Sequence, residues 1–168
     1  MIALDGHKTP ATPRLHRRLA CWVYEGVLLF GVIAPAGLVY ALVTQQRHAL
    51  IGMRGLQLWL FLIIGLYFVW FWSRRGQTLA MRTWHIHVAA NDGLPLTAPR
   101  AVLRYLLSWM WFLPALATVH LAGLKGAVPI AFVVLAGVLG YAGLTRLHPS
   151  RQFWHDVLAG TRLVDKRP

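Results

Sequence analysis

Four long apolar segments, with basic stretches between them, constrain this chain more than any other feature of its sequence. They cover approximately residues 20–43, 56–73, 102–123 and 127–145. Each is close to the roughly 20 residues that a helix needs to cross the apolar core of a bilayer. Only 13% of the 168 residues are charged, against about 25% in a typical soluble domain. The sequence therefore predicts an all-α membrane protein with four transmembrane helices.

The first apolar segment is predicted to remain in the mature protein. It is longer than the hydrophobic region of a secretory signal peptide, and no small-residue cleavage site closes it. We expect an N-terminal tail over residues 1–16, a membrane domain over residues 17–164 and a C-terminal tail over residues 165–168. Prolines permit kinks in three of the spans, at Pro35, Pro114 and Pro129.

The basic residues predict the orientation of the chain. There are 17 Lys and Arg against five Asp and Glu, and the formal net charge is +12. Only Arg47, Arg54 and Lys125 lie in the first and third connections between spans; the other 14 cations lie in the tails or in the second connection. The positive-inside rule then predicts a multi-pass protein of the cytoplasmic (inner) membrane with both termini in the cytoplasm. We expect this basic side to bind anionic lipids rather than nucleic acid.

The connection between the second and third spans is predicted to hold a small cytoplasmic β-hairpin. Aromatic or branched residues alternate with polar ones over residues 83–88, and the turn-forming sequence Asn91-Asp92-Gly93 follows. His85 and His87 would share one strand face and could bind a metal ion, with Asp92 across the turn as a third ligand. Because no further ligand lies nearby, we interpret this face as a polar surface and expect no metal or other cofactor.

After the fourth span, the sequence predicts a short helix that lies in the membrane interface. Pro149 and Ser150 would break the preceding helix and cap the new one, which would run over residues 151–159 and end at Gly160. Asp156 would lie on the flank of this helix, able to face the bundle. Its apolar face would consist of Phe153, Trp154, Val157 and Leu158.

Glu25 is the only acidic residue inside an apolar span. A charge within a membrane helix is costly, so it calls for a partner or a function. Arg14, Arg18 and Cys21 share its stripe of the first helix, and Arg104 at the start of the third span is a second candidate partner. Two interpretations stay open: a structural ion pair, and a carboxylate that binds a proton or small cation and is tuned by a nearby arginine.

The sequence shows no pattern typical of catalysis. Its single cysteine, Cys21, cannot form an internal disulfide or a Cys-based metal cluster. It has no nucleophile elbow, HExxH sequence or Walker loop. We therefore do not expect an enzyme.

Three stretches of the sequence resemble motifs of the RDD family of membrane proteins, which is named for one arginine and two aspartates. The first is RRLACWVYE (17–25), the second is GQTLAMR (76–82) with NDG (91–93) and LRYL (103–106), and the third is HDVLAGTRLV (155–164). They occur in the order of the family and extend over most of the chain.

The resemblance implies which residues carry the signature. The arginine falls on Arg18 and the second aspartate on Asp156, while Glu25 replaces the first aspartate. Together with Arg104, these residues form the predicted functional cluster near the cytoplasmic face.

The resemblance also implies a function linked to transport, because cation/proton exchange is proposed for some members of the family. We therefore expect transport of a cation, a proton or a small solute. A transporter with only four spans would be a homo-oligomer. The alternative is a non-transporting adaptor or assembly protein, which would bind a partner or anionic lipid through its basic face.

Overall fold

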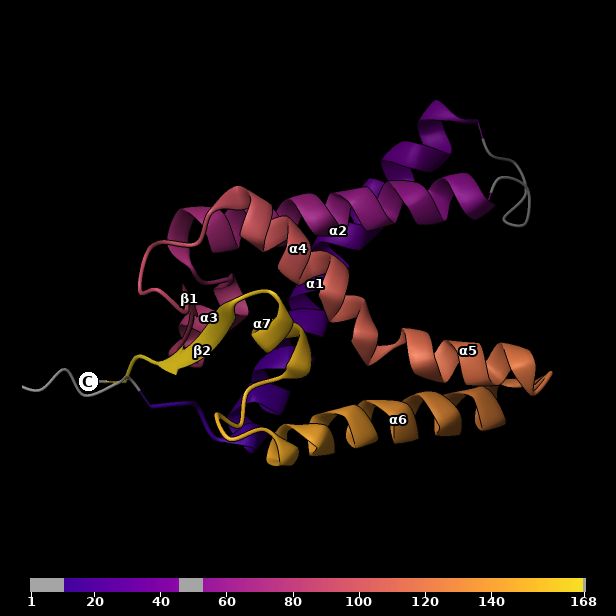
Figure 1. Ribbon diagram of the computed structural model, residues 1–168. Helices are drawn as coiled ribbons and strands as arrows, with labels where there is room; N and C mark the ends of the chain where they lie inside the picture. Colours follow the sequence, from indigo (N-terminus) through magenta and orange to yellow (C-terminus); the bar gives the residue numbers. More distant parts are fainter. Residues whose placement is uncertain (1–10, 46–52, 168) are drawn as a thin grey trace, which may run out of the picture.

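The structure of the protein is a computed structural model, which describes residues 11–45 and 53–167 (Figure 1). The basic residues Lys8 and Arg47 lie outside these ranges. The elements in chain order are α1 (Leu15–Val43), α2 (Met53–Arg75), α3 (Leu79–Thr83), β1 (Ile86–Ala90), α4 (Ala98–Ser108), the 3₁₀ turn η1 (Trp109–Trp111), α5 (Leu113–Leu121), α6 (Ala127–Leu144), the 3₁₀ turn η2 (Thr145–Leu147), α7 (Trp154–Leu158) and β2 (Thr161–Asp165).

In the part of the chain that the structure describes, three helices are long and apolar enough to cross a membrane: α1, α2, and α6 continued by η2. The segment predicted as the third span is bent by 41° between Ala98–Trp111 and Leu113–Leu121. Pro114, in the first turn of α5, lacks the N–H that a continuous helix would use, and its ring clashes with the preceding turn. Pro35, in contrast, stays inside α1. Residues 11–45 and 53–167 therefore contain three candidate spans, or four if the bent pair counts as one.

The predicted β-hairpin is wrong, although its first strand exists. β1 pairs with β2, near the end of the chain, as a two-stranded antiparallel sheet in which Ile86 faces Asp165 and Ala90 faces Thr161. After the Asn91-Asp92-Gly93 turn come Pro95 and Pro99, which have no N–H to donate to a second strand. The chain enters α4 there, and the closing segment supplies the partner strand.

The predicted C-terminal helix is shorter than expected. α7 follows Phe153, so Ser150 is not its N-cap. Its buried face holds His155 and Asp156, while Leu158, predicted on the apolar face, is 56% exposed. Gly160 has a positive φ of 66°, which glycine tolerates, and it turns the chain from α7 into β2.

The sheet, α3 and α7 gather at one end of the long helices, at the left of Figure 1. We call this the basic end, because most described cations lie there. They are Arg14, Arg17, Arg18, Arg74, Arg75, Arg82, Arg100, Arg104, Arg146, Arg151, Arg162, Lys166 and Arg167. Arg54 and Lys125 lie at the opposite ends of the helices, where α2 begins and α5 connects to α6. This charge asymmetry agrees with a membrane that separates the two ends.

The interior of the basic end is packed, whereas the distal helices expose apolar side chains. Buried apolar residues such as Ile86, Val88 and Leu163 come from the sheet, and Ala101 and Tyr105 come from α4. The exposed side chains on the distal helices include Phe30, Leu121, Val128 and Phe132. An apolar surface of this kind suits contact with lipid rather than with water.

Close packing of α4 on α2 fixes the start of the third segment. A Cβ atom at Gly65 would come 2.8 Å from the ring of Tyr105, so only glycine lets the ring lie this close. The Tyr105 hydroxyl also donates a hydrogen bond to the Phe61 carbonyl at 2.7 Å. These contacts position the neighbouring residue, Arg104.

The orientation of the chain is testable with single cysteines in a Cys21→Ala background. Leu94 follows β1 at the basic end, and Lys125 lies between α5 and α6; both are exposed. Because the basic end should face the cytoplasm, a membrane-impermeant maleimide should label Lys125→Cys in sealed right-side-out vesicles and Leu94→Cys only after the vesicles are opened. The reverse pattern would contradict the predicted orientation. Labelling of both cysteines in sealed vesicles would put both positions on the same side of the membrane, so the bent segment between them would not be a fourth span.

Candidate functional site

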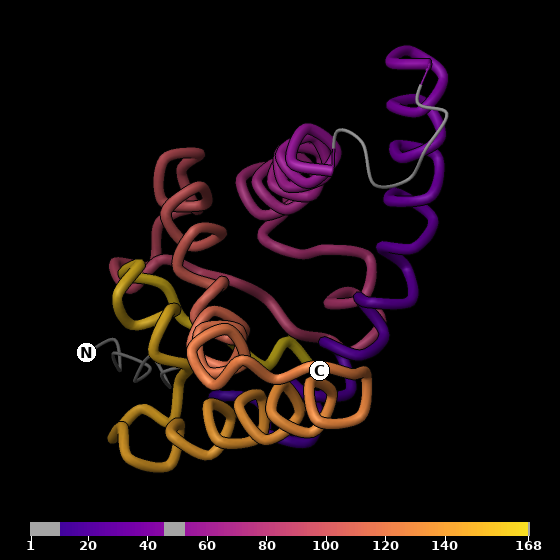
Figure 2. Tube along the Cα trace, turned by 90° about the vertical axis from the view of Figure 1, so that its right-hand side faces the viewer, coloured from indigo at the N-terminus to yellow at the C-terminus, as the bar shows by residue number. Residues whose placement is uncertain are grey.

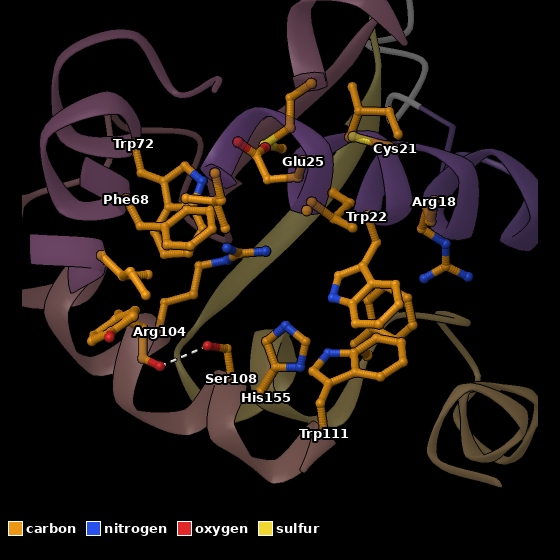
Figure 3. A pocket seen from close by; sticks show the side chains of 18 of the residues that line it. Arg18, Cys21, Trp22, Glu25, Phe68, Trp72, Arg104, Ser108, Trp111 and His155 are labelled. Carbon is orange, nitrogen blue, oxygen red and sulfur yellow. Dashed lines mark hydrogen bonds between the residues drawn. The ribbon is translucent and has the colours of Figure 1, made fainter. Parts of the chain in front are cut away.

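A cavity of about 510 Å³ lies at the basic end, bounded by α1, α2, α4, η1 and the segment that leads into α7 (Figure 3). Its volume falls in the range of small-molecule sites. Most of the wall is apolar and much of it is aromatic, and the charged side chains of the described residues that reach it are Arg18, Glu25 and Arg104. The aromatic wall includes Trp22, Phe68, Trp72, Trp109, Trp111, Phe112 and Phe153. The cavity therefore combines an apolar volume with a few charged groups.

A buried ion pair joins α4 to α7 beside this cavity. Nε of Arg104 donates to Oδ1 of Asp156 at 2.7 Å, and Asp156 has no exposed surface. The Arg104 guanidinium also lies 4.1 Å from the centre of the Trp72 ring, an arrangement that stabilises a cation. Asp156 itself does not line the cavity. Asp156 lies on the side of Arg104 away from the cavity, so the guanidinium faces the cavity while the carboxylate balances its charge.

His155 extends this pair into a small network that the sequence reasoning missed. The Tyr141 hydroxyl accepts the His155 backbone N–H at 3.0 Å and shares a second hydrogen bond with His155 Nδ1 at 2.9 Å. The other ring nitrogen, Nε2, lies 3.5 Å from Asp156 Oδ1. Thr161 adds a hydrogen bond to the Asp156 carbonyl at 3.2 Å. The position of His155 directly before the motif aspartate was the signal that could have identified it.

Glu25 is held by hydroxyl groups rather than by an arginine. It is 6% exposed on α1. Its Oε1 accepts a hydrogen bond from the Tyr67 hydroxyl of α2 at 2.7 Å, and its Oε2 accepts one from Thr78 at the start of α3. No ion pair between the described residues involves Glu25, so the predicted pairing with Arg18 or Arg104 does not form. Thr78 belongs to the GQTLAMR stretch, which indicated the motif but not this contact.

Arg18 lies at the edge of the cavity, beside Trp22 in Figure 3. It is 5% exposed, and its guanidinium lies 4.4 Å from the centre of the Phe153 ring. Its Nε and Nη1 are buried without a hydrogen-bond partner among residues 11–45 and 53–167. The preceding Arg17 is different, because it forms an ion pair with Asp165 at 2.5 Å and ties α1 to β2.

The structure thus brings the four predicted residues to one region and divides them into two groups. Arg104 and Asp156 are paired with each other. Arg18 and Glu25 face the same cavity from one helix, and neither forms an ion pair with a described residue. The sequence indicated the members of this cluster, but it did not indicate which of them pair.

The alternative metal site does not assemble in the part of the chain that the structure describes. No group of three or more His, Cys, Asp or Glu side chains meets there. His85 precedes β1 with a positive φ of 53°, so it is not on the same strand face as His87. Asp92 forms an exposed ion pair with Arg100 at 2.7 Å.

The network around His155 makes stability depend on pH. Burial lowers the pKa of His155 to about 4 from an ordinary value near 6.5, so the unfolded chain binds a proton in a pH range where the folded protein does not. Stability should therefore fall as the pH drops from about 6.5 to about 4, and this contribution should level off below that. His155→Gln should make the decline shallower in thermal unfolding of the purified protein in detergent. An unchanged pH dependence in this variant would contradict the assignment.

The comparison with protein families agrees with the motifs that lie around this cavity. The model of the RDD family matches residues 12–160, which is the bulk of the chain. Neither the curated proteins nor the solved structures gave a match. The match begins just before α1 and ends just before β2, so it includes Arg18, Glu25, Arg104 and Asp156. The chain therefore belongs to the RDD family of membrane proteins.

Proposed function

We propose that this protein is a membrane transporter in which Glu25 binds and releases a proton or small cation. One observation carries the proposal: a carboxylate buried inside a membrane helix faces a cavity of about 510 Å³ and is held by two hydroxyls instead of an arginine. Intramembrane carboxylates that face a cavity are candidates for ion and proton sites.

The partners of Glu25 suit a site that exchanges its ion. An arginine at hydrogen-bond distance would neutralise the carboxylate permanently and leave no need for another cation. The hydroxyls of Tyr67 and Thr78 are neutral. They orient the two oxygens, but they leave the negative charge to be balanced by a proton or by a cation such as Na⁺. Hydroxyl and carboxylate oxygens are also suitable ligands for such cations.

The helices around the cavity offer places at which a pathway could open. The 41° bend between η1 and α5 comes directly after Trp111, a residue of the cavity wall. Pro35 lies in α1 on the distal side of Glu25. Helices bend most readily at prolines and at interruptions of this kind. Movement there would connect the cavity with the distal side of the membrane.

The proposal includes the setting of the transporter. We place the protein in the inner membrane with the basic end in the cytoplasm, as the distribution of cations indicates, and we expect a homo-oligomer because so few spans give a narrow pathway. We assign it no catalytic reaction. An adaptor that binds anionic lipid is the second candidate, favoured by the exposed Arg75 and Arg82 that line a smaller recess at the basic end.

The ion site is testable in liposomes that contain purified protein and an internal pH dye. Addition of Na⁺, K⁺ or Li⁺ outside should change the internal pH, and Glu25→Gln should reduce the rate at least tenfold because the amide binds neither a proton nor a cation at this position. Asp92→Asn removes a carboxylate from an exposed ion pair outside the cavity and should leave the rate unchanged. Wild-type rates equal to those of empty vesicles, or full activity of Glu25→Gln, would contradict the proposal.

A further inference from the structure

The side chains that line the cavity carry more hydrogen-bond donors than acceptors to receive them. Nε and Nη1 of Arg18 and Nε1 of Trp72 are buried without partners among the described residues. In the same part of the chain, Arg104 uses only its Nε, toward Asp156. The one carboxylate that lines the cavity, Glu25, already accepts two hydrogen bonds. Buried donors are rarely left without partners in folded proteins, so the surplus indicates a ligand rich in acceptors.

Arg18 is the group whose charge is least compensated. The other buried arginines at this end have carboxylate partners: Arg17 binds Asp165 and Arg104 binds Asp156. Arg18 has the face of the Phe153 ring and, with no ion pair among the described residues, only the longer-range attraction of Asp156. Asp156 Oδ2 is also without a partner, but it is buried behind Arg104 and does not line the cavity. A buried guanidinium without a hydrogen-bonded counter-charge is unfavourable, and an anion bound to Arg18 would lower this cost.

The walls around Arg18 suit an apolar body attached to that anion. Trp22 stacks on Trp111 with ring centres 5.5 Å apart, and Phe112 lies 6.0 Å from Trp22. Trp22 and Val23 are 39% and 59% exposed, so the cavity reaches the outer surface of α1. In a membrane, lipid would cover this surface. Arg18 lies in the first turn of α1, near the depth at which lipid headgroups would lie.

We propose that Arg18 binds the oxyanion head of an amphipathic anion, whose apolar body lies along the aromatic wall beside Trp22. The head is a phosphate, carboxylate or sulfonate, and such a ligand could enter from the bilayer as an anionic lipid or from water as an organic acid. The inference rests on the proposed function in one respect: it makes this anion a solute that the proposed transporter would carry through the same cavity. Binding at Arg18 does not require that the protein transports ions.

The test measures binding in nanodiscs of zwitterionic phosphatidylcholine. Radiolabelled 4-toluenesulfonate probes entry from water, and 4-toluenesulfonamide is its uncharged counterpart; phosphatidate added to the nanodisc, counted by native mass spectrometry, probes entry from the bilayer. At least one of the two anions should bind saturably, and the sulfonamide should not. Saturation by toluenesulfonate alone assigns a water-soluble acid, and retention of phosphatidate alone assigns a lipid.

Variants of Arg18 and Arg14 show whether Arg18 binds a ligand or only stabilises the fold. Arg18→Gln should weaken binding at least tenfold while the protein stays folded, because the variant loses the contact with Phe153 but no hydrogen bond among the described residues; Arg18→Lys should retain part of the binding. Arg14→Gln is the matched control, since it removes one exposed arginine one turn earlier. Equal binding of sulfonate and sulfonamide, full binding by Arg18→Gln, or no saturable binding of either anion would overturn the inference.

The outcome is independent of the liposome experiment. Anion binding without Glu25-dependent proton movement would overturn the proposed transport function and leave the anion site. Proton movement without anion binding would support the proposed transport function and overturn the anion site.

Discussion

Arg104 and Asp156 bind each other at 2.7 Å inside the basic end, and the two residues are 52 positions apart in the chain. Around this pair, α4 packs on α2, α7 packs on α4, and β2 continues into the sheet with β1 (Figure 2). A buried charge that loses its partner is strongly destabilising. The pair therefore requires that the last segment of the chain returns to the helix bundle, and the cavity depends on that return.

The same pair explains how the cavity can carry charge in an apolar setting. Asp156 compensates Arg104 from behind, and His155 stays neutral because burial lowers its pKa to about 4. Two groups facing the cavity, Glu25 and Arg18, then remain without a charged partner among the described residues. These are the two residues at which we propose a site for a proton or cation and a site for an anion.

Much of the fold could be predicted from the sequence, because the strongest signals are local. The length and hydropathy of each segment located α1, α2 and α6, and an acidic residue inside an apolar run singled out Glu25. The pairing of distant segments could not be predicted in this way. A strand was expected over residues 83–88 and lies at Ile86–Ala90, but its partner β2 lies 71 or more positions away on the chain. The contacts of Glu25 with Tyr67 and Thr78 also depend on how α2 and α3 pack against α1, which neither composition nor periodicity specifies.

The central claim is that the buried Arg104–Asp156 pair holds the site together, and a double-mutant cycle measures this most directly. Arg104→Gln, Asp156→Asn and the double variant would be compared by unfolding in mixed micelles, with Arg100 and Asp92 as the matched cycle. Both pairs have the same 2.7 Å separation, but only the first is buried. We expect a coupling free energy of about 3 kcal/mol for the buried pair and less than about 1 kcal/mol for the exposed one. Additive effects at Arg104 and Asp156, or equal coupling in the two cycles, would contradict the account.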